Sequence, residues 1–406
     1  MKTILVASHS MEIGGAEISL LGLLNAINYN QYKIDLFLYR HTGEFMALIP
    51  KHVNLLPQND RYASLAVPMI SAVKKRQYSM VAGRLIGKIK AYYFDKKQKA
   101  EVSVAGIEYS HKYTKSFLPL INPSVNYDLA ISFLTPHYIV AEKVKAKKKV
   151  AWIHNDYSVV TVDIESENKM WSQYDYIASI SEESTEAFCS TFPKLRPRIV
   201  HIENILSPKF VRQQAELFDA NQEMTEADCK VKLLSVGRFS YQKNFENIPA
   251  ICQLILATGH SVKWYIIGYG NGESLIKSKI EEFGMQEHVK ILGKKINPYP
   301  YFKACDIYVQ PSRYEGKAVT VREAQMLHKP VVITDFPTAK SQLNDGVDGI
   351  IVPLNNKGCA EGIIRLINDN DLQKRLIENC RKTDYGNEPE IEKIYMLMEQ
   401  GIRRYC

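Results

Sequence analysis

The stretch Asp306–Asp335, DIYVQPSRYEGKAVTVREAQMLHKPVVITD, decides the fold. Two apolar runs rich in β-branched residues, Ile307–Val309 and Val331–Thr334, bracket a polar loop and a short helical pattern over Thr320–Leu327. Strand, helix and strand in this order form a β-α-β unit with parallel strands. Both strands are continuously apolar, as strands covered on both faces are. The sequence therefore predicts an α/β protein.

The loop of this unit carries two carboxylates at the edge of the sheet where open α/β proteins bind ligands. Glu315 lies on the loop and Glu323 just inside the helix, eight positions later. Each carboxylate can bind hydroxyls at one end of an elongated ligand. An anion site made of backbone N–H groups and the helix N-terminus is expected between them, at Gly316, Lys317, Ala318, Val319 and Thr320. Hydroxyl, phosphate and hydroxyl outline a sugar nucleotide, although an ordinary β-α-β unit with two solvated glutamates has the same pattern.

The spacing of the two glutamates resembles a family signature. EGxxxxxxEA, from Glu315 to Ala324, resembles the signature of family 4 glycosyltransferases, which have the two-domain GT-B fold. The resemblance implies that Glu315 contacts the donor sugar and that Glu323 contacts the ribose.

Length and composition indicate a globular protein of two domains. The chain has 406 residues, of which 46% are hydrophobic and 24% are charged, and one core rarely grows beyond ~250–300 residues. Seven dispersed cysteines with no metal-ligand spacing predict free thiols in a reducing cytosol. The apolar run at the N-terminus is too short for a signal peptide, and no stretch approaches the ~20 apolar residues of a spanning helix. We expect a soluble or peripheral protein.

The positive charge is concentrated in one region. Between Arg61 and Phe117 the chain has twelve Lys and Arg residues and three Asp and Glu residues, so this segment has a charge of +9. The net charge of the whole chain is +8, so the remainder carries −1. Residues 59–116 depart from β-α alternation, and Val73–Lys99 spaces apolar and aromatic residues along a basic helix pattern. Such a region suits an anionic membrane surface. Solvated helices packed on the domain core explain it equally, and nucleic acid has no recognisable motif to support it.

In the first half, a glycine pair follows the first strand. After the strand Thr3–Ala7, Gly14 and Gly15 occupy the turn and Glu17 lies in the first turn of a helix. Glycines there let the backbone approach a ligand and leave N–H groups free, although a tight βα connection also explains them. In the family, a GGxE loop at this place closes over the donor phosphates or faces the acceptor.

A histidine stands at the tip of a later strand. His154 follows Lys149–Ile153 directly and precedes Asn155 and Asp156, which favours hydrogen bonding over packing. The resemblance implies that His154 is the family's catalytic-site histidine, which contacts the donor sugar and lines the acceptor pocket. Further on, Ser181 is predicted to cap the helix after the strand Tyr176–Ile180.

The second half opens with the strand Lys232–Val236 and the loop GRFSYQKN. Gly237, Arg238 and Lys243 match the family's GR…KN motif, in which Arg and Lys hold the donor pyrophosphate. Two cations on a Gly-loosened loop can neutralise a leaving diphosphate; the alternative is a pair of solvated basic residues.

Other features of the second half are less specific. GYGNG after Trp264–Ile267 lacks dinucleotide-binding spacing and is interpreted as a tight turn. The family holds the base on the loop after His288–Leu292, which gives Lys294 and Ile296 as base contacts made mainly through the backbone. Pro337–Lys340 replaces the family's Gly-Gly-x-x-E type turn, and this variant resembles the branch that builds bacterial capsular and other surface polysaccharides.

The resemblance implies two Rossmann-like domains facing across a cleft. Residues 1–205 are expected to form the acceptor domain with the basic insertion at about 59–116, residues 230–387 the donor domain, and residues 388–406 a helix that in this fold crosses back to the first domain. A polar linker is expected before residue 230.

The resemblance implies a retaining glycosyltransferase that moves a hexosyl or N-acetylhexosaminyl group from a nucleotide sugar, with UDP preferred, to a glycan or lipid-linked acceptor. The expected catalytic residues are His154, Glu315, Arg238 and Lys243, and the acceptor contacts are Glu17, His154 and Asn155. Two cations can replace a metal, so no metal or other cofactor is expected. The predicted location is the cytoplasm, with peripheral attachment to the inner face of the membrane left open.

Two alternatives share this fold. A GT-B sugar-nucleotide epimerase needs acid and base carboxylates and no acceptor. A non-catalytic partner subunit of a glycosyltransferase complex has no need of all four of Glu315, Glu323, Arg238 and Lys243.

Overall fold

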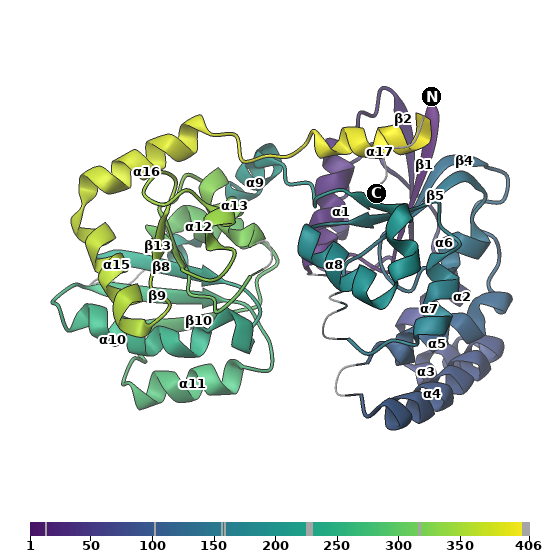
Figure 1. Ribbon diagram of the computed structural model, residues 1–406, viewed down its shortest axis with the longest axis horizontal. Helices are drawn as coiled ribbons and strands as arrows, with labels where there is room; N and C mark the ends of the chain where they lie inside the picture. Colours follow the sequence, from purple (N-terminus) through teal and green to yellow (C-terminus); the bar gives the residue numbers. More distant parts are fainter. Residues whose placement is uncertain are drawn as a thin grey trace. The chain divides into compact units, whose positions relative to one another are not determined.

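The chain divides into two compact units, each built on one parallel sheet (Figure 1). The computed structural model describes residues 1–12, 14–100, 103–155, 157, 160–224, 230–315 and 318–399. The first unit comprises residues 1–206 and 387–406, and the second comprises residues 207–386. The predicted α/β class is confirmed.

The sheet of the first unit has, among the described residues, seven strands in the order β3-β2-β1-β4-β5-β6-β7. All neighbouring pairs are parallel. The strands are β1 (Lys2–Ser8), β2 (Tyr32–Leu38), β3 (Asn54–Leu55), β4 (Tyr127–Ser132), β5 (Ala146–Trp152), β6 (Tyr176–Ser179) and β7 (Ile199–His201).

The sheet of the second unit has, within the part of the chain described, six strands in the order β10-β9-β8-β11-β12-β13, again all parallel. They are β8 (Val231–Val236), β9 (Val262–Ile267), β10 (Val289–Gly293), β11 (Ile307–Gln310), β12 (Val331–Thr334) and β13 (Ile350–Val352). This is the Rossmann order, in which ligands bind beyond the carboxyl ends of the strands where the order reverses. In the second unit that point lies between β8 and β11; in the first it lies between β1 and β4.

Helices cover both faces of each sheet (Figure 1). The first unit holds α1 (Gly15–Ala26), α2 (Asp60–Ala63), α3 (Met69–Lys74), α4 (Tyr78–Gln98), α5 (Ala105–Thr114), α6 (Tyr138–Lys143), α7 (Ile164–Trp171), α8 (Glu182–Thr191) and α17 (Glu390–Glu399). The second holds α9 (Pro208–Ala215), α10 (Ile248–Leu256), α11 (Glu273–Glu282), α12 (Tyr299–Ala304), α13 (Val319–Met326), α14 (Ala339–Gln342), α15 (Asn356–Asn368) and α16 (Asn370–Lys382). Among the described helices none is both long and apolar enough to cross a membrane.

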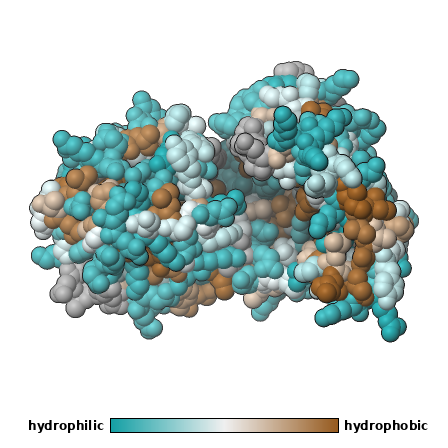
Figure 2. Space-filling view, turned by 90° about the horizontal axis from the view of Figure 1, so that it is seen from below, coloured by the Kyte–Doolittle hydropathy of each residue, from teal (hydrophilic) through white to brown (hydrophobic). Residues whose placement is uncertain are grey.

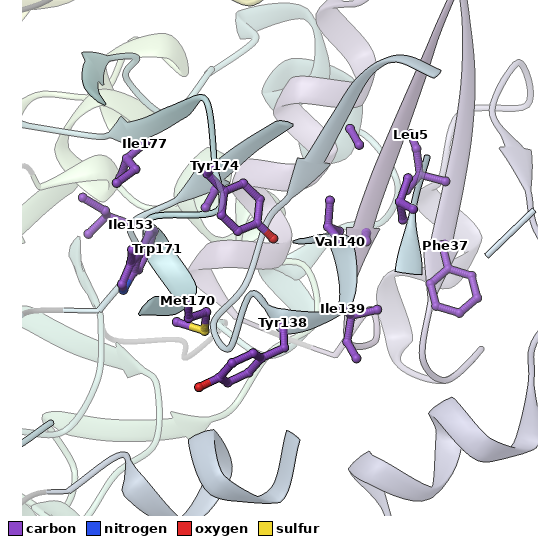
Figure 3. Close-up of a cluster of buried hydrophobic side chains, with 14 of the residues drawn as sticks. Leu5, Phe37, Tyr138, Ile139, Val140, Ile153, Met170, Trp171, Tyr174 and Ile177 are labelled. Carbon is purple, nitrogen blue, oxygen red and sulfur yellow. The ribbon is translucent and has the colours of Figure 1, made fainter. Parts of the chain in front are cut away.

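The core of each unit follows from the apolar strands. In the first unit, buried side chains of the strands pack on α6 and α7, and Figure 3 shows Trp171 and Met170 of α7 beside Tyr174 and Ile177. In the second unit, β-branched strand residues pack on α10 and α15. At the end of β6, Ser181 caps α8 by accepting from the N–H of Ser184, which confirms the predicted cap.

The last described helix, α17, lies on the first unit. Tyr395 stacks on Tyr32 at 4.0 Å between ring centroids, and its hydroxyl accepts from the N–H of Asn28 at 2.9 Å. Lys2 forms an ion pair with Glu399 at 2.6 Å. These contacts place the chain's last described helix against its first two strands.

The second unit begins at Ser207, earlier than the predicted residue 230. The expected linker was interpreted from its polarity, but its polar side chains bond to α12 and α13. Arg212 donates to the carbonyl of Met326 at 3.2 Å, and Glu223 accepts from the hydroxyl of Tyr301 at 2.7 Å. Long-range hydrogen bonds thus attach residues 207–224 to the second unit.

Candidate functional site

Two loops of the second unit meet where its strand order reverses. One follows β8 and carries Gly237, Arg238 and Lys243; the other follows β11 and carries Glu315. β8 and β11 are hydrogen-bonded neighbours. The topology therefore brings the loop of Glu315 to the loop that carries Gly237, Arg238 and Lys243, more than seventy positions earlier in the sequence.

Lys243 and Glu315 form an ion pair. Lys243 Nζ lies 2.6 Å from Glu315 Oε1, and the two side chains are 15% and 4% exposed. The Glu315 carboxylate also accepts from Ser312 Oγ at 2.5 Å, from Gln310 Nε2 at 3.1 Å and from Gln242 Nε2 at 3.1 Å. The sequence predicted separate roles for Lys243 and Glu315; the structure adds direct contact and a fixed carboxylate orientation.

Glycines permit this arrangement. A Cβ atom on Gly237 would lie 3.2 Å from Cε of Lys243, so the glycine leaves room for the lysine stem. Gly268, with a φ of +153°, lies so close that a Cβ would be 1.9 Å from the carbonyl oxygen of Gly237. The GYGNG segment is thus a turn that supports the loop after β8, in agreement with its interpretation as a turn.

The remaining cations and the predicted base contacts lie nearer the surface. Arg238 is exposed, two residues beyond the end of β8. Lys294 Nζ lies 5.1 Å from the ring centroid of Tyr269, and the side chain of Ile296 is exposed. Arg238 is therefore accessible to a ligand.

Glu323 is buried within α13. Its carboxylate accepts from the hydroxyl of Tyr299 at 2.8 Å. Burial raises the pKa of Glu323 to about 7, against the opposing effect of the Tyr299 hydrogen bond. A carboxyl group with this pKa changes charge near neutral pH. A ligand hydroxyl that donates a hydrogen bond to the carboxylate would favour its ionised form.

Two residues of the segment after β12 hold the ends of the Glu315 loop. Thr338 Oγ1 donates to the carbonyl of Glu315 at 2.6 Å, and Gln342 Oε1 accepts from the N–H of Ala318 at 2.9 Å. The N–H of Ala318, expected to bind an anion, is therefore already bonded. Thr338 and Gln342 were not predicted as site residues. Thr338 lies in the segment Pro337–Lys340 that replaces the family's Gly-Gly-x-x-E type turn, and Gln342 had no signal beyond its place after a strand of the same sheet.

The other residues of the predicted anion site divide into two groups. Val319 and Thr320 form the first turn of α13, and Thr320 Oγ1 donates to Gln310 Oε1 at 3.3 Å. Gly316 and Lys317 lie outside the described residues.

In the first unit, the glycine pair begins α1. Gly14 is the N-cap residue and Gly15 the first residue of the helix. The Glu17 carboxylate folds back over Gly14. A Cβ atom on Gly14 would lie only 2.2 Å from Glu17 Oε2. Gly15 has open space around it and is exposed. The glycine pair thus leaves a small exposed backbone surface beside a carboxylate.

His154 lies two residues beyond the end of β5. Its ring packs on Phe133 at 4.7 Å between centroids, and Nε2 is buried without a hydrogen-bond partner in the described structure. Packing was not expected from the polar residues that follow it. Burial lowers the pKa of His154 to about 4, so the ring is neutral at pH 7. Asn155 is half-buried, and Asp156 lies outside the described residues.

Other polar atoms without partners stand at the same edge of the first sheet. Ser8 Oγ and His9 Nε2 at the end of β1, and Trp152 Nε1 at the end of β5, are buried without hydrogen-bond partners among the described residues. Burial lowers the pKa of His9 to about 3. Buried polar groups are normally bonded, so this edge has unused capacity for a polar ligand or water.

An Asp-x-Asp tripeptide can be a metal-binding signature, but in this chain Asp369–Asp371 lies at the start of α16 and not on the loops after β8 and β11. The Asp369 carboxylate accepts from the N–H of Leu372 at 2.8 Å and caps α16. Its role in the described structure is that of a helix cap.

A comparison with protein families identifies the segment that holds the Lys243–Glu315 pair. Residues 219–383 match the family model of glycosyl transferases group 1. The match includes Arg238, Lys243, Glu315 and Glu323.

Curated relatives match mainly over the same half. The chain is 30% identical over 149 residues to the capsular polysaccharide biosynthesis glycosyltransferase CapM of Staphylococcus aureus, covering 36% of this chain and 39% of that protein. It is 25% identical over 220 residues to the uncharacterized glycosyltransferase MJ1607 of Methanocaldococcus jannaschii, covering 52% and 55%. The chain spans about half the length of the first curated relatives it matches.

Solved structures match over both units. Anabaena HepE in complex with UDP-glucose has a TM-score of 0.61 and 16% identity and covers 98% of each chain. S. aureus TarM, in a complex containing UDP, has a TM-score of 0.65 and 13% identity and covers 98% of this chain and 100% of that one. At these identities the likeness shows the fold, which is that of GT-B glycosyltransferases.

Proposed function

We propose that this protein is a retaining glycosyltransferase that moves a hexosyl or N-acetylhexosaminyl group from a UDP-sugar to a glycan or lipid-linked acceptor in the building of a bacterial surface polysaccharide. The observation that carries the proposal is the buried Lys243–Glu315 pair at the reversal of the second sheet, with exposed Arg238 on the same loop as Lys243. The group 1 family match over these residues supports it. UDP in related folds and capsular relatives support the finer assignment.

The charges of the second unit suit a nucleotide sugar. Arg238 and Lys243 supply two cations for the diphosphate, which carries negative charge both when bound and when leaving. Glu315 is fixed by three neutral donors besides Lys243 and offers its carboxylate to sugar hydroxyls. Glu323 is proposed to accept from the ribose hydroxyls.

In the reaction, the bond between the sugar C1 and the diphosphate oxygen breaks, and its electron pair leaves with the UDP. The acceptor oxygen forms the new bond to C1 on the same face, and its proton passes to the leaving phosphate oxygen. The cations stabilise the charge that develops on the diphosphate. This route needs no covalent intermediate on Glu315, and we expect no metal.

The first unit supplies the acceptor side. His154 is neutral, with a free Nε2, and can exchange a hydrogen bond with a hydroxyl without adding charge. Glu17 and Asn155 are proposed as further acceptor contacts, Gly14 and Gly15 as backbone contacts to the donor phosphates, and Lys294 and Ile296 as the base contacts. We place the reaction in the cytoplasm.

The test is product analysis with UDP-sugars. The protein is incubated with UDP-glucose or UDP-N-acetylglucosamine, with and without lipid-linked and soluble saccharides, and the anomeric configuration of the product is read by NMR. We expect an α-linked product from the α-linked donor only when an acceptor is present, and loss of transfer in Glu315→Ala.

Three outcomes would reject the proposal. A β-linked product would reject retention. Conversion of the donor sugar to its epimer without acceptor would favour an epimerase. Donor binding with no turnover on any acceptor would favour a partner subunit.

A further inference from the structure

Helix α4 turns its smallest residues inward. Met80, Gly83, Gly87 and Ala91 are buried, and α4 packs on α5 along its length. A Cβ on Gly87 would lie 2.8 Å from the backbone of Tyr109, and one on Gly83 would lie 2.6 Å from the carbonyl oxygen of Tyr113. The buried face of α4 is therefore a close backbone contact that takes in Met80, and most of the other large side chains of α4 lie elsewhere.

Those large side chains face solvent. Tyr78, Leu85, Ile86, Ile89, Tyr92 and Tyr93 are 47 to 65% exposed, and the 3.6-residue period places them on one side of α4, opposite the glycines. We call these six residues the apolar stripe. Figure 2 shows hydrophobic side chains gathered on the part of the surface that α4 occupies. An ordinary surface helix has the reverse arrangement, with apolar residues inward.

Lysines border the apolar stripe. Lys88 lies on one side of it and Lys90 and Lys97 on the other, and all three are exposed. Within α4 the acidic residue is Asp95, which is half-buried. The preceding helix, α3, adds exposed Ile70 and ends at Lys74, which is followed by Lys75 and Arg76. The surface thus combines exposed apolar area with positive charge.

We propose that the apolar stripe and its bordering lysines dock the first unit on an anionic lipid bilayer. Apolar and tyrosine side chains between lysines are what an interfacial helix needs, because the apolar residues enter the acyl boundary while the cations meet lipid phosphates. A second copy of the chain would bring the same positive charges together, which opposes self-association through this face. Charge complementarity therefore favours anionic lipid as the partner.

This docking surface is independent of the proposed function, since it uses none of the residues assigned to transfer. It would hold the first unit against a membrane without a spanning helix. A lipid-linked acceptor would then be encountered at the surface where it resides.

The test is vesicle flotation of the full-length protein. Vesicles of equimolar phosphatidylglycerol and phosphatidylcholine are compared with vesicles of phosphatidylcholine alone. The variants are Ile89→Ser with Tyr92→Ser, and Lys88→Gln with Lys90→Gln. The matched control is Leu275→Ser with Lys277→Gln on α11, where Leu275 is as exposed as Ile89. Circular dichroism melting checks that each variant is folded.

We expect binding to the anionic vesicles only, weakened at high salt. Each double variant should reduce vesicle affinity about twenty-fivefold, because each surface lysine adds roughly fivefold and each apolar side chain a comparable factor; the α11 control should bind like wild type. Failure to bind anionic vesicles, or equal binding by all variants, would overturn the proposal. So would a wild-type dimer in light scattering that becomes monomeric in Ile89→Ser with Tyr92→Ser, which would make the stripe a self-association face. Transfer to a soluble acceptor is measured separately, so failure of docking does not mimic failure of the proposed activity.

Discussion

Lys243 Nζ and Glu315 Oε1 lie 2.6 Å apart although 72 positions separate the two residues in the sequence. The contact exists because β8 and β11 are neighbours and their following loops meet at one edge of the second sheet. Glu315 has three further donors, so its position is fixed before any ligand arrives. A diphosphate that binds Lys243 would therefore enter a site whose carboxylate is already oriented.

The pair predicts an asymmetric effect on stability. Lys243→Met leaves the Glu315 charge buried with only neutral donors, so the unfolding free energy should fall by about 2–3 kcal/mol. This value lies at or below the lower end of the range for broken buried ion pairs, because Lys243 is partly exposed. Glu315→Gln keeps most of the hydrogen bonds and should cost less, about 1 kcal/mol. Urea denaturation of both single variants and the double variant measures this. Additive effects would show that the two side chains do not interact.

Burial of Glu323 predicts a pH dependence of stability. Its folded-state pKa of about 7 lies above the value in the unfolded chain, so the folded state binds more protons between about pH 4.5 and 7. The contribution of Glu323 to stability therefore falls as pH rises through this window. Glu323→Gln removes the ionisation and keeps an acceptor for Tyr299. From pH 5 to pH 8 its unfolding free energy should gain about 1–3 kcal/mol relative to wild type, and a constant difference would contradict the assignment.

Thr338 and Gln342, in the segment after β12, are predicted to position the loop that carries Glu315. Thr338→Val removes the hydrogen bond to the carbonyl of Glu315, and Gln342→Leu removes the acceptor for the N–H of Ala318. Because neither residue is assigned to the donor, each change should raise KM for the donor roughly fivefold to tenfold with a smaller change in kcat.

Steady-state kinetics checks this split, with Thr383→Val as the matched control, since Thr383 is an exposed threonine that bonds only its own helix in the described structure. A control that behaves like Thr338→Val would show that the effect is general.

The contact between α4 and α5 predicts that no large side chain fits at Gly87 without loss of stability. Gly87→Leu places side-chain atoms where Tyr109 backbone already lies, so it should lower unfolding free energy by about 1–3 kcal/mol. Ala82→Leu on the exposed side of the same helix should change it by less than about 0.5 kcal/mol. Thermal denaturation compares the two variants. Equal stabilities would show that α4 does not pack on α5 through its glycines.

Local pattern sufficed for the buried strands in the interior of the second sheet. β11 and β12 occupy the predicted apolar runs within one residue, because parallel strands covered on both faces are rich in β-branched residues. The edge strands β3 and β13 were missed, since two or three residues carry too little pattern. The start of the second unit was misplaced because polarity was interpreted as a linker when those side chains bond across the fold.

The site was predictable as a set of residues and less so as a geometry. The motifs singled out Arg238, Lys243, Glu315 and Glu323, whose roles stay predictions, but the Lys243–Glu315 contact arises from tertiary structure. The role of Thr338 has the same origin, because its hydrogen bond joins segments 23 positions apart. No local rule reports that His154 packs on Phe133 with its Nε2 left unbonded.

The most direct test of the central claim, a UDP-sugar site on the second unit, is thermal shift with UDP, GDP and ADP. A ligand that binds only the folded state raises the melting temperature with its affinity. We predict that UDP gives the largest rise in wild type and in the control Lys382→Met, an exposed lysine on α16. In Lys243→Met and Glu323→Ala, UDP should no longer raise the melting temperature above that of the same variant without ligand. A rise that survives in both variants, or no rise with any nucleotide, would contradict the account.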